Sequence, residues 1–258
     1  MRTMGIGIVI VAAASGVLLP LFRQGKAERE AQAAPSDRAA PAAADAAKVY
    51  GEWSIQIRPD KGKEYDQLIR EKGLPLFREA GGRMVGWWKT LIGDLYEHVT
   101  IWEYDGLPAF EKAVQFLQKD ERFARFVEAR DPLLAGERSS FLKLAGFAEK
   151  PSLPDAAKFV IHEIHRVPLS RQEAYLLFME KQLPVLRQHG FRPAGPWLAA
   201  VGDWSEVTYL FRFESLAERD RLIASFSSQE AGRAYREGVV RFVEAVRTRL
   251  LVSAPFAQ

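Results

Sequence analysis

The sequence EKGLPLFREAGGRMVGWWKTLIGD at residues 71–94 returns as EKQLPVLRQHGFRPAGPWLAAVGD at residues 180–203. The two copies lie 109 residues apart and stay in register without a gap over residues 55–147 and 164–256. A period of this size is that of a whole domain, and so it indicates a tandem duplication and not a solenoid of short repeats. The matched identities include Glu71/Glu180, Leu74/Leu183, Pro75/Pro184, Gly86/Gly195 and Trp88/Trp197.

The composition is ordinary for a globular protein, and it excludes several kinds of site. Of the 258 residues, 48% are hydrophobic and 27% are charged, and the net charge is +3. So small a charge gives no basic stripe of the kind that nucleic-acid binders use, and we expect no nucleic-acid partner. The absence of cysteine excludes disulfides, thiolate nucleophiles, iron–sulfur clusters and cysteine-ligated zinc.

An uncharged run of 18 residues, GIGIVIVAAASGVLLPLF at 5–22, lies close to the N-terminus. Its length suits the core of a signal peptide or a short membrane-spanning helix. Residues 1–30 are therefore predicted to be a signal peptide or a membrane anchor that forms an apolar helix. A small-residue site, Ala31-Gln32-Ala33, follows only after several charged residues, which favours an uncleaved anchor. We expect an exported protein, either periplasmic or membrane-anchored.

Two segments of linker composition divide the rest of the chain. Residues 31–47 are rich in alanine and proline and contain few large apolar side chains, which is typical of a tether. Residues 150–154 place two prolines in a polar stretch, which marks a boundary between the repeats. The predicted domains are residues 48–149 and 158–258, each of about 100 residues and so large enough to bury a core.

Each repeat has the element pattern β-α-β-β-α-β of a ferredoxin-like fold. In the first copy, the hairpin signal Gly93-Asp94 joins two apolar segments, and Lys119-Asp120 breaks the second helical region. The predicted elements are a strand at 49–58, a helix at 63–80, strands at 83–91 and 96–104, a helical region at 107–129 and a strand at 137–147.

Prolines and serines predict where the helices bend and begin. Pro75 and Pro184 lie inside the first helix of their repeats and should kink it, because proline removes a backbone donor and clashes with the preceding turn. In the second copy, Ser170-x-x-Glu173 and Ser215-x-x-Glu218 are capping boxes, and they predict the N-termini of both helical regions.

The predicted strands are apolar on both faces. Trp87 and Trp88 are adjacent, and neighbouring residues of a strand point to opposite faces of the sheet. Both faces therefore need a cover, and the helices supply only one. We expect an α+β chain in which the second repeat supplies the other, so that two four-stranded sheets face each other within one chain. Association of such chains into a higher oligomer stays open.

Four short motifs lie in the folded part of the chain: Leu74-Pro75-Leu76, Val85-Gly86-x-Trp88, Ile101-Trp102-Glu103-Tyr104-Asp105 and the terminal Ala254-Pro255-Phe256. Together they resemble the NIPSNAP family, over residues 49–149 and 158–258. The resemblance implies two tandem ferredoxin-like repeats that form an intramolecular dimeric α/β-barrel with a binding cleft, and it implies no particular reaction. The chain departs from the family in its first strand, where Gly51 and Trp53 replace the Glu and Arg that members tend to have.

The histidines give few grounds for a metal site. His162 and His165 lie in one predicted strand at odd spacing, so they point to opposite faces and cannot share one ion. No helical His-Glu-x-x-His spacing occurs, and we expect no metal and no cofactor. His98 alternates with Thr100 and Trp102 along one strand face. It therefore lies either in a pocket, as an acid/base, or in a satisfied core position.

Aromatic and polar strand residues are the candidates for a ligand pocket, although ordinary packing also explains strand aromatics. The second copy has Val207 where the first has His98, and Tyr209 where the first has Thr100, so a site is expected to be asymmetric. The candidate pocket residues are Trp88, Thr100, Trp102, Trp197 and Tyr209, with His98 as the candidate catalytic residue.

Two functions of different classes fit this sequence. The first is an exported or membrane-tethered module that binds a small apolar ligand or a protein partner, held at the membrane by its N-terminal helix if that helix is uncleaved. The second is a cofactor-independent monooxygenase or an isomerase, in which His98 would transfer a proton inside an aromatic pocket. The two differ in whether His98→Ala abolishes a turnover or only lowers stability.

Overall fold

The computed structural model describes residues 48–151 and 157–257. The predicted N-terminal apolar helix and the tether lie outside these residues, as does most of the predicted boundary at 150–154. Among the described helices, none is both long enough and apolar enough to cross a membrane.

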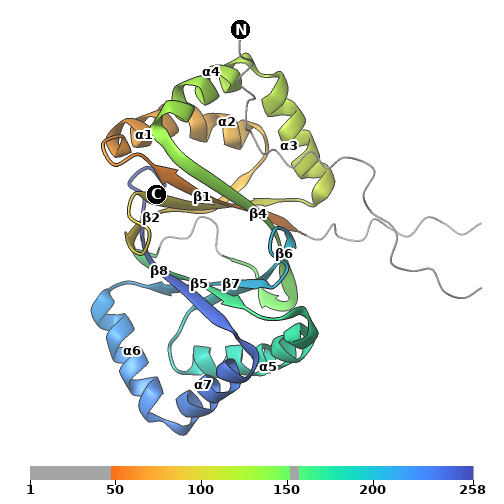
Figure 1. The fold of residues 1–258 in the computed structure, drawn as a ribbon, viewed down its shortest axis with the longest axis vertical. Helices are drawn as coiled ribbons and strands as arrows, with labels where there is room; N and C mark the ends of the chain where they lie inside the picture. The colour runs from red at the N-terminus through yellow and green to blue at the C-terminus, as the bar shows by residue number, and fades with distance from the viewer. Residues whose placement is uncertain (1–47, 152–156, 258) are drawn as a thin grey trace, which may run out of the picture. The chain divides into compact units, whose positions relative to one another are not determined.

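Both repeats have the predicted order of elements (Figure 1). The first consists of β1 (Val49–Ile57), α1 (Gly62–Leu68), a π-helical turn (Ile69–Gly73), α2 (Leu74–Glu79), β2 (Arg83–Ile92), β3 (Glu97–Tyr104), α3 (Leu107–Lys119), α4 (Glu121–Arg130), a 3-10 turn (Asp131–Leu133) and β4 (Leu134–Glu149). The second consists of β5 (Phe159–Arg166), α5 (Leu169–Gln188), β6 (Pro193–Val201), β7 (Glu206–Phe213), α6 (Leu216–Ser228), α7 (Glu230–Phe242) and β8 (Ala245–Ser253).

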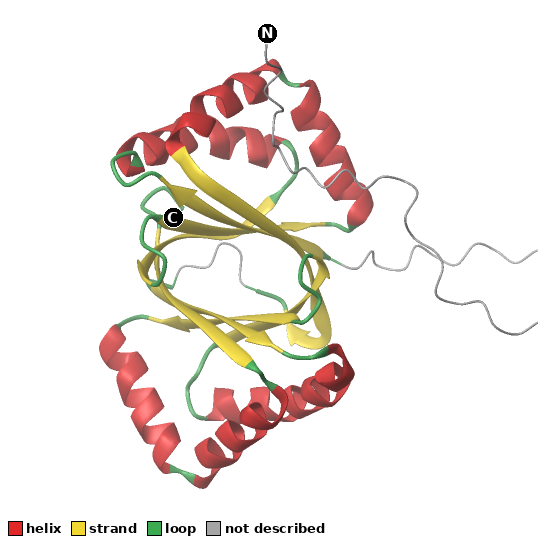
Figure 2. Cartoon of the chain, viewed as in Figure 1, coloured by secondary structure: helices red, strands yellow, loops and turns green. Residues whose placement is uncertain are grey.

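The eight strands close into one antiparallel barrel in the order β1-β3-β2-β8-β5-β7-β6-β4. Figure 2 shows the strands in the middle and the helices of each repeat on the outside. The barrel closes at two seams between the repeats, where β2 pairs with β8 and β4 pairs with β6. The prediction that one chain supplies both sheets is confirmed.

Strand β4 belongs to both sheets. Its first part pairs with β1, from Leu134 to Lys143, and its last part pairs with β6 of the other repeat, from Phe141 to Glu149. This double pairing explains why β4 has 16 residues and extends beyond the predicted strand at 137–147.

Alternate residues of each strand point into the barrel or toward the helices, as the pleat requires. The core inside the barrel takes residues from every strand, namely Tyr50, Val85, Trp88, Val99, Leu142, Val160, Trp197, Leu210 and Leu251 among others. A separate core beneath the helices of the second repeat holds Tyr175, Met179, Val207, Tyr209 and Phe226 among others. Both faces of the sheets are thus covered, as predicted.

Matched glycines make room for the matched tryptophans. A Cβ atom at Gly86 would lie 2.0 Å from the Trp88 ring, and one at Gly195 would lie 2.8 Å from the Trp197 ring. Both indoles are fully buried inside the barrel. Each indole ring therefore lies against the backbone of its own strand, over the glycine two positions earlier. Any larger residue there would collide with the ring, which explains why the Gly-x-Trp spacing occurs in both repeats.

Two of the predicted helix boundaries are confirmed. Helix α3 ends at Lys119, and the Asp120 side chain caps α4 by accepting a hydrogen bond of 2.7 Å from the backbone N–H of Arg122. Ser215 caps α6, where its hydroxyl accepts a hydrogen bond of 3.0 Å from the backbone N–H of Glu218.

One prediction for the first helix of the second repeat needs correction. Ser170 is no cap, because α5 begins one residue earlier at Leu169, after Pro168, and the serine already lies in the first turn. Pro184 does not interrupt α5, whereas at Pro75 the first repeat passes through a π-helical turn before α2 begins. A π-helical turn lengthens the hydrogen-bond spacing and so accommodates the bond that proline cannot make.

Candidate functional site

The structure does not gather the predicted site residues into one pocket. Trp88 and Trp197 lie inside the barrel. Trp102 and Tyr209 lie on the other face, beneath the helices: the Trp102 ring contacts Phe77 of α2 at 5.6 Å, and Tyr209 belongs to the core beneath α5. The strand pleat divides these residues between two faces, and the sequence shows that division. The sequence does not show which of the two faces lies inside the barrel.

His98 also lies on the helix side, in a closed polar cluster of the first repeat. The indole N–H of Trp87 donates to its Nδ1 at 3.1 Å, and its Nε2 lies 3.8 Å from Oδ1 of Asp66. The edge of Tyr65 packs against the ring at 5.3 Å, and Lys89 pairs with the other oxygen of Asp66. Thr100, the next residue on this face, donates to the backbone carbonyl of Gly86 at 3.0 Å.

This geometry determines the protonation of His98. Burial, with a smaller effect of the Lys89 charge, lowers the pKa of its imidazole to about 3. An indole N–H can only donate, so Nδ1 of the neutral ring accepts and the proton lies on Nε2, toward Asp66. The one lone pair that could take a proton from a substrate is already occupied. His98 is therefore held as a buried donor, and the acid/base role gains no support from its surroundings.

The second repeat carries a chain of short hydrogen bonds that we call the tyrosine relay: Glu163, His165, Tyr175 and Tyr209. His165 Nε2 lies 2.5 Å from Oε1 of Glu163, and its Nδ1 lies 2.6 Å from the Tyr175 hydroxyl. That hydroxyl donates to the Tyr209 hydroxyl at 2.8 Å. His165 and both tyrosines are buried, and Glu163 is partly exposed. The relay thus connects the protein surface with the core beneath α5.

The tyrosine relay places the His165 ring between a carboxylate and a hydroxyl. One ring nitrogen faces Glu163, and the other faces Tyr175. An imidazole between a carboxylate and a hydroxyl is the arrangement that activates nucleophiles and general bases. Burial raises the pKa of both tyrosine hydroxyls well above the usual value.

A second polar cluster crosses the inside of the barrel, and we call it the cross-barrel network. His162 Nε2 of β5 lies 3.3 Å from Oε1 of Glu52 of β1. Arg249 of β8 donates to the Ser54 hydroxyl at 3.0 Å, and its Nε lies 3.2 Å from Oε2 of Glu97. Burial by itself would raise the pKa of Glu52, but His162 and the nearby arginines outweigh it and lower that pKa. These pairs join the two repeats.

The histidines are separated as predicted, His162 facing the inside of the barrel and His165 facing the helices. Within residues 48–151 and 157–257, no three His, Asp or Glu side chains are grouped so as to hold a metal ion.

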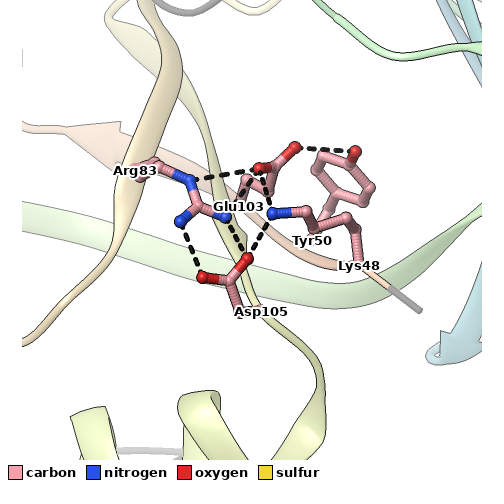
Figure 3. A network of polar contacts seen from close by, with 5 residues as sticks. All are labelled: Lys48, Tyr50, Arg83, Glu103 and Asp105. Carbon is pink, nitrogen blue, oxygen red and sulfur yellow. Dashed lines mark hydrogen bonds and ion pairs between the residues drawn. The ribbon is translucent and has the colours of Figure 1, made fainter. Parts of the chain in front are cut away.

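A third polar cluster lies where β1 and β2 begin and β3 ends (Figure 3). Arg83 of β2 donates to Glu103 at 2.8 Å and to Asp105 at 2.5 Å, and the Tyr50 hydroxyl donates to Glu103 at 2.9 Å. Lys48 pairs with both carboxylates. The two anions are thus shared among two cations and a phenol. Burial by itself would raise the pKa of Glu103, but Arg83, Tyr50 and Lys48 outweigh it and hold that pKa below its usual value.

An apolar groove runs along α5 of the second repeat, between this helix and strands β4 and β6. Its volume is about 490 Å³. It is lined by Ala145, Gly146, Phe147, Leu169, Gln172, Glu173, Leu176, Leu177, Glu180 and Leu198. Three of its leucines replace polar residues at the matched positions of the first repeat, in the pairs Asp60/Leu169, Gln67/Leu176 and Lys89/Leu198. The fold is the same in both repeats, so leucine at these three positions is not a requirement of the fold.

Comparison with known proteins decides the family. The NIPSNAP family model matches residues 52–149 and 165–258, which is most of the chain and both repeats. The chain belongs to the NIPSNAP family. Protein NipSnap homolog 2 of Homo sapiens is 22% identical over 171 residues, which make up 64% of this chain and 58% of that protein. The match thus spans less than two thirds of the human relative.

The NIPSNAP barrel has fold neighbours with other names. A proposed monooxygenase from Lactobacillus acidophilus NCFM superposes with a TM-score of 0.58 at 12% identity, over 81% of this chain and 94% of that one. An anthrone oxidase-like protein superposes with a TM-score of 0.56 at 13% identity, over 81% of this chain and 92% of that one. At such low identity these likenesses show a shared fold and nothing more.

The sequence did not indicate the tyrosine relay or the cross-barrel network of this NIPSNAP chain. The tyrosine relay occupies positions that are Ser54, Gln56, Asp66 and Thr100 in the first repeat. One signal was available: Glu163 and His165 are two residues apart in a strand, so they share a face. Nothing local indicates that Tyr175, on a helix, would meet them. Arg249 and Glu97 gave a weaker signal, because each lies in a strand that also carries other charged and polar residues.

Proposed function

We propose that this NIPSNAP protein binds a small apolar molecule in the groove along α5. One observation carries the proposal: Leu169, Leu176 and Leu198 replace polar residues at matched positions of a repeat with the same fold. Leu169 and Leu177 are 59% and 54% exposed beside this groove, and exposed apolar side chains grouped in this way are typical of a binding surface. The volume of about 490 Å³ is within the range of small-molecule sites.

The groove lies directly on the core that contains the tyrosine relay. Phe147, Leu176 and Leu198 line the groove and also pack against the cluster that includes Tyr175 and Tyr209. A bound molecule would therefore rest on side chains that pack against the same core as the two tyrosines.

The tyrosine relay supports a second candidate function, acid–base catalysis on the bound molecule. The reaction class would be that of a cofactor-independent monooxygenase or an isomerase, in which the Tyr175 hydroxyl takes a proton from carbon or oxygen of the substrate while it passes its own proton to Nδ1 of a neutral His165. The fold neighbours named as a monooxygenase and as an anthrone oxidase-like protein suggest anthrone as a first substrate to test. This role belongs to Tyr175 and Tyr209 and no longer to His98.

The binding proposal is tested with a neutral fluorescent probe, N-phenyl-1-naphthylamine, whose emission rises in apolar surroundings. We expect saturable binding to the full chain that is at least tenfold weaker, about 1.4 kcal/mol, in Leu198→Lys and Leu176→Gln, which restore the residues of the first repeat. The control is Val240→Lys, at a position 77% exposed and outside the groove. Equal binding by all four proteins, or none by the parent, would overturn the proposal.

Catalysis is tested separately with anthrone and dioxygen. We expect the full chain to consume dioxygen and Tyr175→Phe to lose about 100-fold or more in rate while it still binds the probe, because removal of a general acid or base costs about 10²–10⁴-fold. Should Tyr175→Phe turn over anthrone as fast as the parent chain, the relay is a structural network and the binding function stands alone.

A further inference from the structure

A cavity of about 320 Å³ lies at the C-terminal end of α5, apart from the groove. It is lined by Glu149, Arg187, Phe191, Arg192 and Arg212 among others. Three guanidinium groups thus line one small cavity whose lining holds a single carboxylate. This composition favours an anionic ligand, because guanidinium groups bind oxyanions through several parallel hydrogen bonds.

The first repeat shows what the second has lost at this place. Arg83 and Glu103 of the ion network in Figure 3 match Arg192 and Arg212 of the second repeat. In the first repeat, the Glu103 carboxylate is the buried anion that Arg83 and Lys48 hold. In the second, the same strand position carries a cation. The fold is thus kept while a buried carboxylate is replaced by a positive charge at the matched strand position.

Two arginines of the cavity retain unused donors. The Nη2 atoms of Arg187 and Arg192 are buried, and within the described part of the chain neither has a hydrogen-bond partner. Nη1 of Arg192 donates to Glu214, the counterpart of Asp105, at 2.8 Å. Its Nη2 lies 3.6 Å from Glu218, which is beyond hydrogen-bond length. Nη1 of Arg187 lies 3.4 Å from Glu149. Buried donors without acceptors are costly, and a ligand oxygen would satisfy them.

We propose that this cavity binds the phosphate group of a small molecule. A phosphate offers three acceptor oxygens and up to two negative charges, which suits several guanidinium donors better than a single carboxylate group does. Arg212 adds a third charge, while its Nε donates to the backbone carbonyl of Arg192 at 3.3 Å. The α5 C-terminus presents the negative end of its dipole here, so attraction comes from the side chains and not from the helix.

The proposal is independent of the apolar groove and adds a second ligand class to the second repeat. Glu149, Glu214 and Glu218 compete for the same arginines, so binding is expected to be moderate and to weaken with salt. The ligand is accordingly a group that is exchanged with solvent and not a permanent part of the fold.

Isothermal titration of the full chain with inorganic phosphate and with phenyl phosphate tests the site. We expect binding by the parent chain, and weakening of at least tenfold, about 1.4 kcal/mol, in Arg212→Glu and in Arg187→Gln. Arg212→Glu restores the residue of the first repeat. Arg187→Gln removes the charge but keeps a polar side chain, and it serves as the test if the first variant fails to fold. The matched control is Arg78→Gln, the first-repeat counterpart of Arg187.

The outcomes separate clearly. Retained binding in Arg78→Gln with loss in Arg187→Gln supports the site. Equal losses in Arg78→Gln and Arg187→Gln would show attraction to net charge only and overturn it, as would absence of binding by the parent chain at up to about 10 mM phosphate. Phosphate should also raise the melting temperature of the parent chain and leave that of Arg187→Gln unchanged.

Discussion

His98 is enclosed by Trp87, Tyr65 and Asp66, and it is only 4% exposed. Its surroundings supply one donor to the ring and no bulk water, so the neutral form is strongly favoured. The same residue type has the opposite surroundings at His165, where a carboxylate and a hydroxyl flank the ring. At the residue scale, the chemistry of each histidine follows from its partners, and these come from other elements.

The low pKa of His98 makes stability depend on pH. Its pKa is about 3 in the folded chain, against an ordinary value of 6.5, so the unfolded chain takes up a proton first as the pH falls. The contribution is complete above pH 6.5 and is lost progressively as the pH falls toward 3. Between pH 7 and pH 5 we expect the free energy of unfolding to drop by about 2 kcal/mol from this residue.

Urea unfolding of the parent chain and of His98→Gln at both pH values measures this effect. The glutamine side chain does not titrate, so the variant should be less stable at pH 7 and show a smaller loss on acidification. An identical loss in both proteins would mean that His98 titrates normally in the folded state.

At the element scale, helix starts depend on which residue reaches the cap position and not only on the local pattern. The motifs at Ser170 and Ser215 look alike in the sequence, but only Ser215 precedes its helix. Its hydroxyl accepts from Glu218, and the Glu218 carboxylate accepts from the backbone N–H of Glu214 at 2.6 Å. The other serine lies one residue inside α5, where its hydroxyl caps nothing.

The two serines therefore form a matched pair of test sites. Ser215→Ala should lower the free energy of unfolding by about 1 kcal/mol, because a helix N–H loses its acceptor. Ser170→Ala should change it by less than about 0.5 kcal/mol, since alanine is a good residue inside a helix. Urea unfolding followed by circular dichroism measures both, and a larger loss in Ser170→Ala than in Ser215→Ala would contradict the assignment of the caps.

At the scale of the whole molecule, the cross-barrel network connects residues that are far apart in the sequence. Arg249 and Ser54 are separated by 195 positions, and they meet because β8 and β1 lie in opposing sheets of a closed barrel. Arg249 is 2% exposed and Glu97 is 5% exposed, so each charge depends on the other. A buried pair of this kind is costly to break from one side.

Removing one partner should therefore cost more than removing both. Arg249→Met should lower the free energy of unfolding by about 3–5 kcal/mol, because it leaves Glu97 buried without its cation. Adding Glu97→Gln should recover at least half of that loss. Urea unfolding monitored by tryptophan fluorescence measures the cycle, and losses that simply add would show that the two charges are independent.

The sequence by itself determined the duplication, the order of elements in each repeat and the closure of both sheets within one chain. These depend on local patterns: glycine and proline at turns, alternation along strands, and apolar residues on both strand faces that need two covers. The Gly86 and Trp88 pair recurs as Gly195 and Trp197 because the packing that it serves lies within one strand. The NIPSNAP resemblance followed from the same motifs and is confirmed by the family match.

Only the tertiary structure decided which strand face lies inside the barrel and which residues meet across it. The pleat divides the residues of a strand between two faces, but it does not say which face lies inside the barrel. In β2, a register shift between Met84 and Gly86 also changes which alternate residues point inward. Trp88 and Tyr209 therefore lie on opposite sides of the sheets, although both were predicted for one pocket. The tyrosine relay requires a helix to be placed over a strand, and the cross-barrel network requires two sheets to face each other. Such contacts depend on long-range strand pairing, which no local pattern encodes.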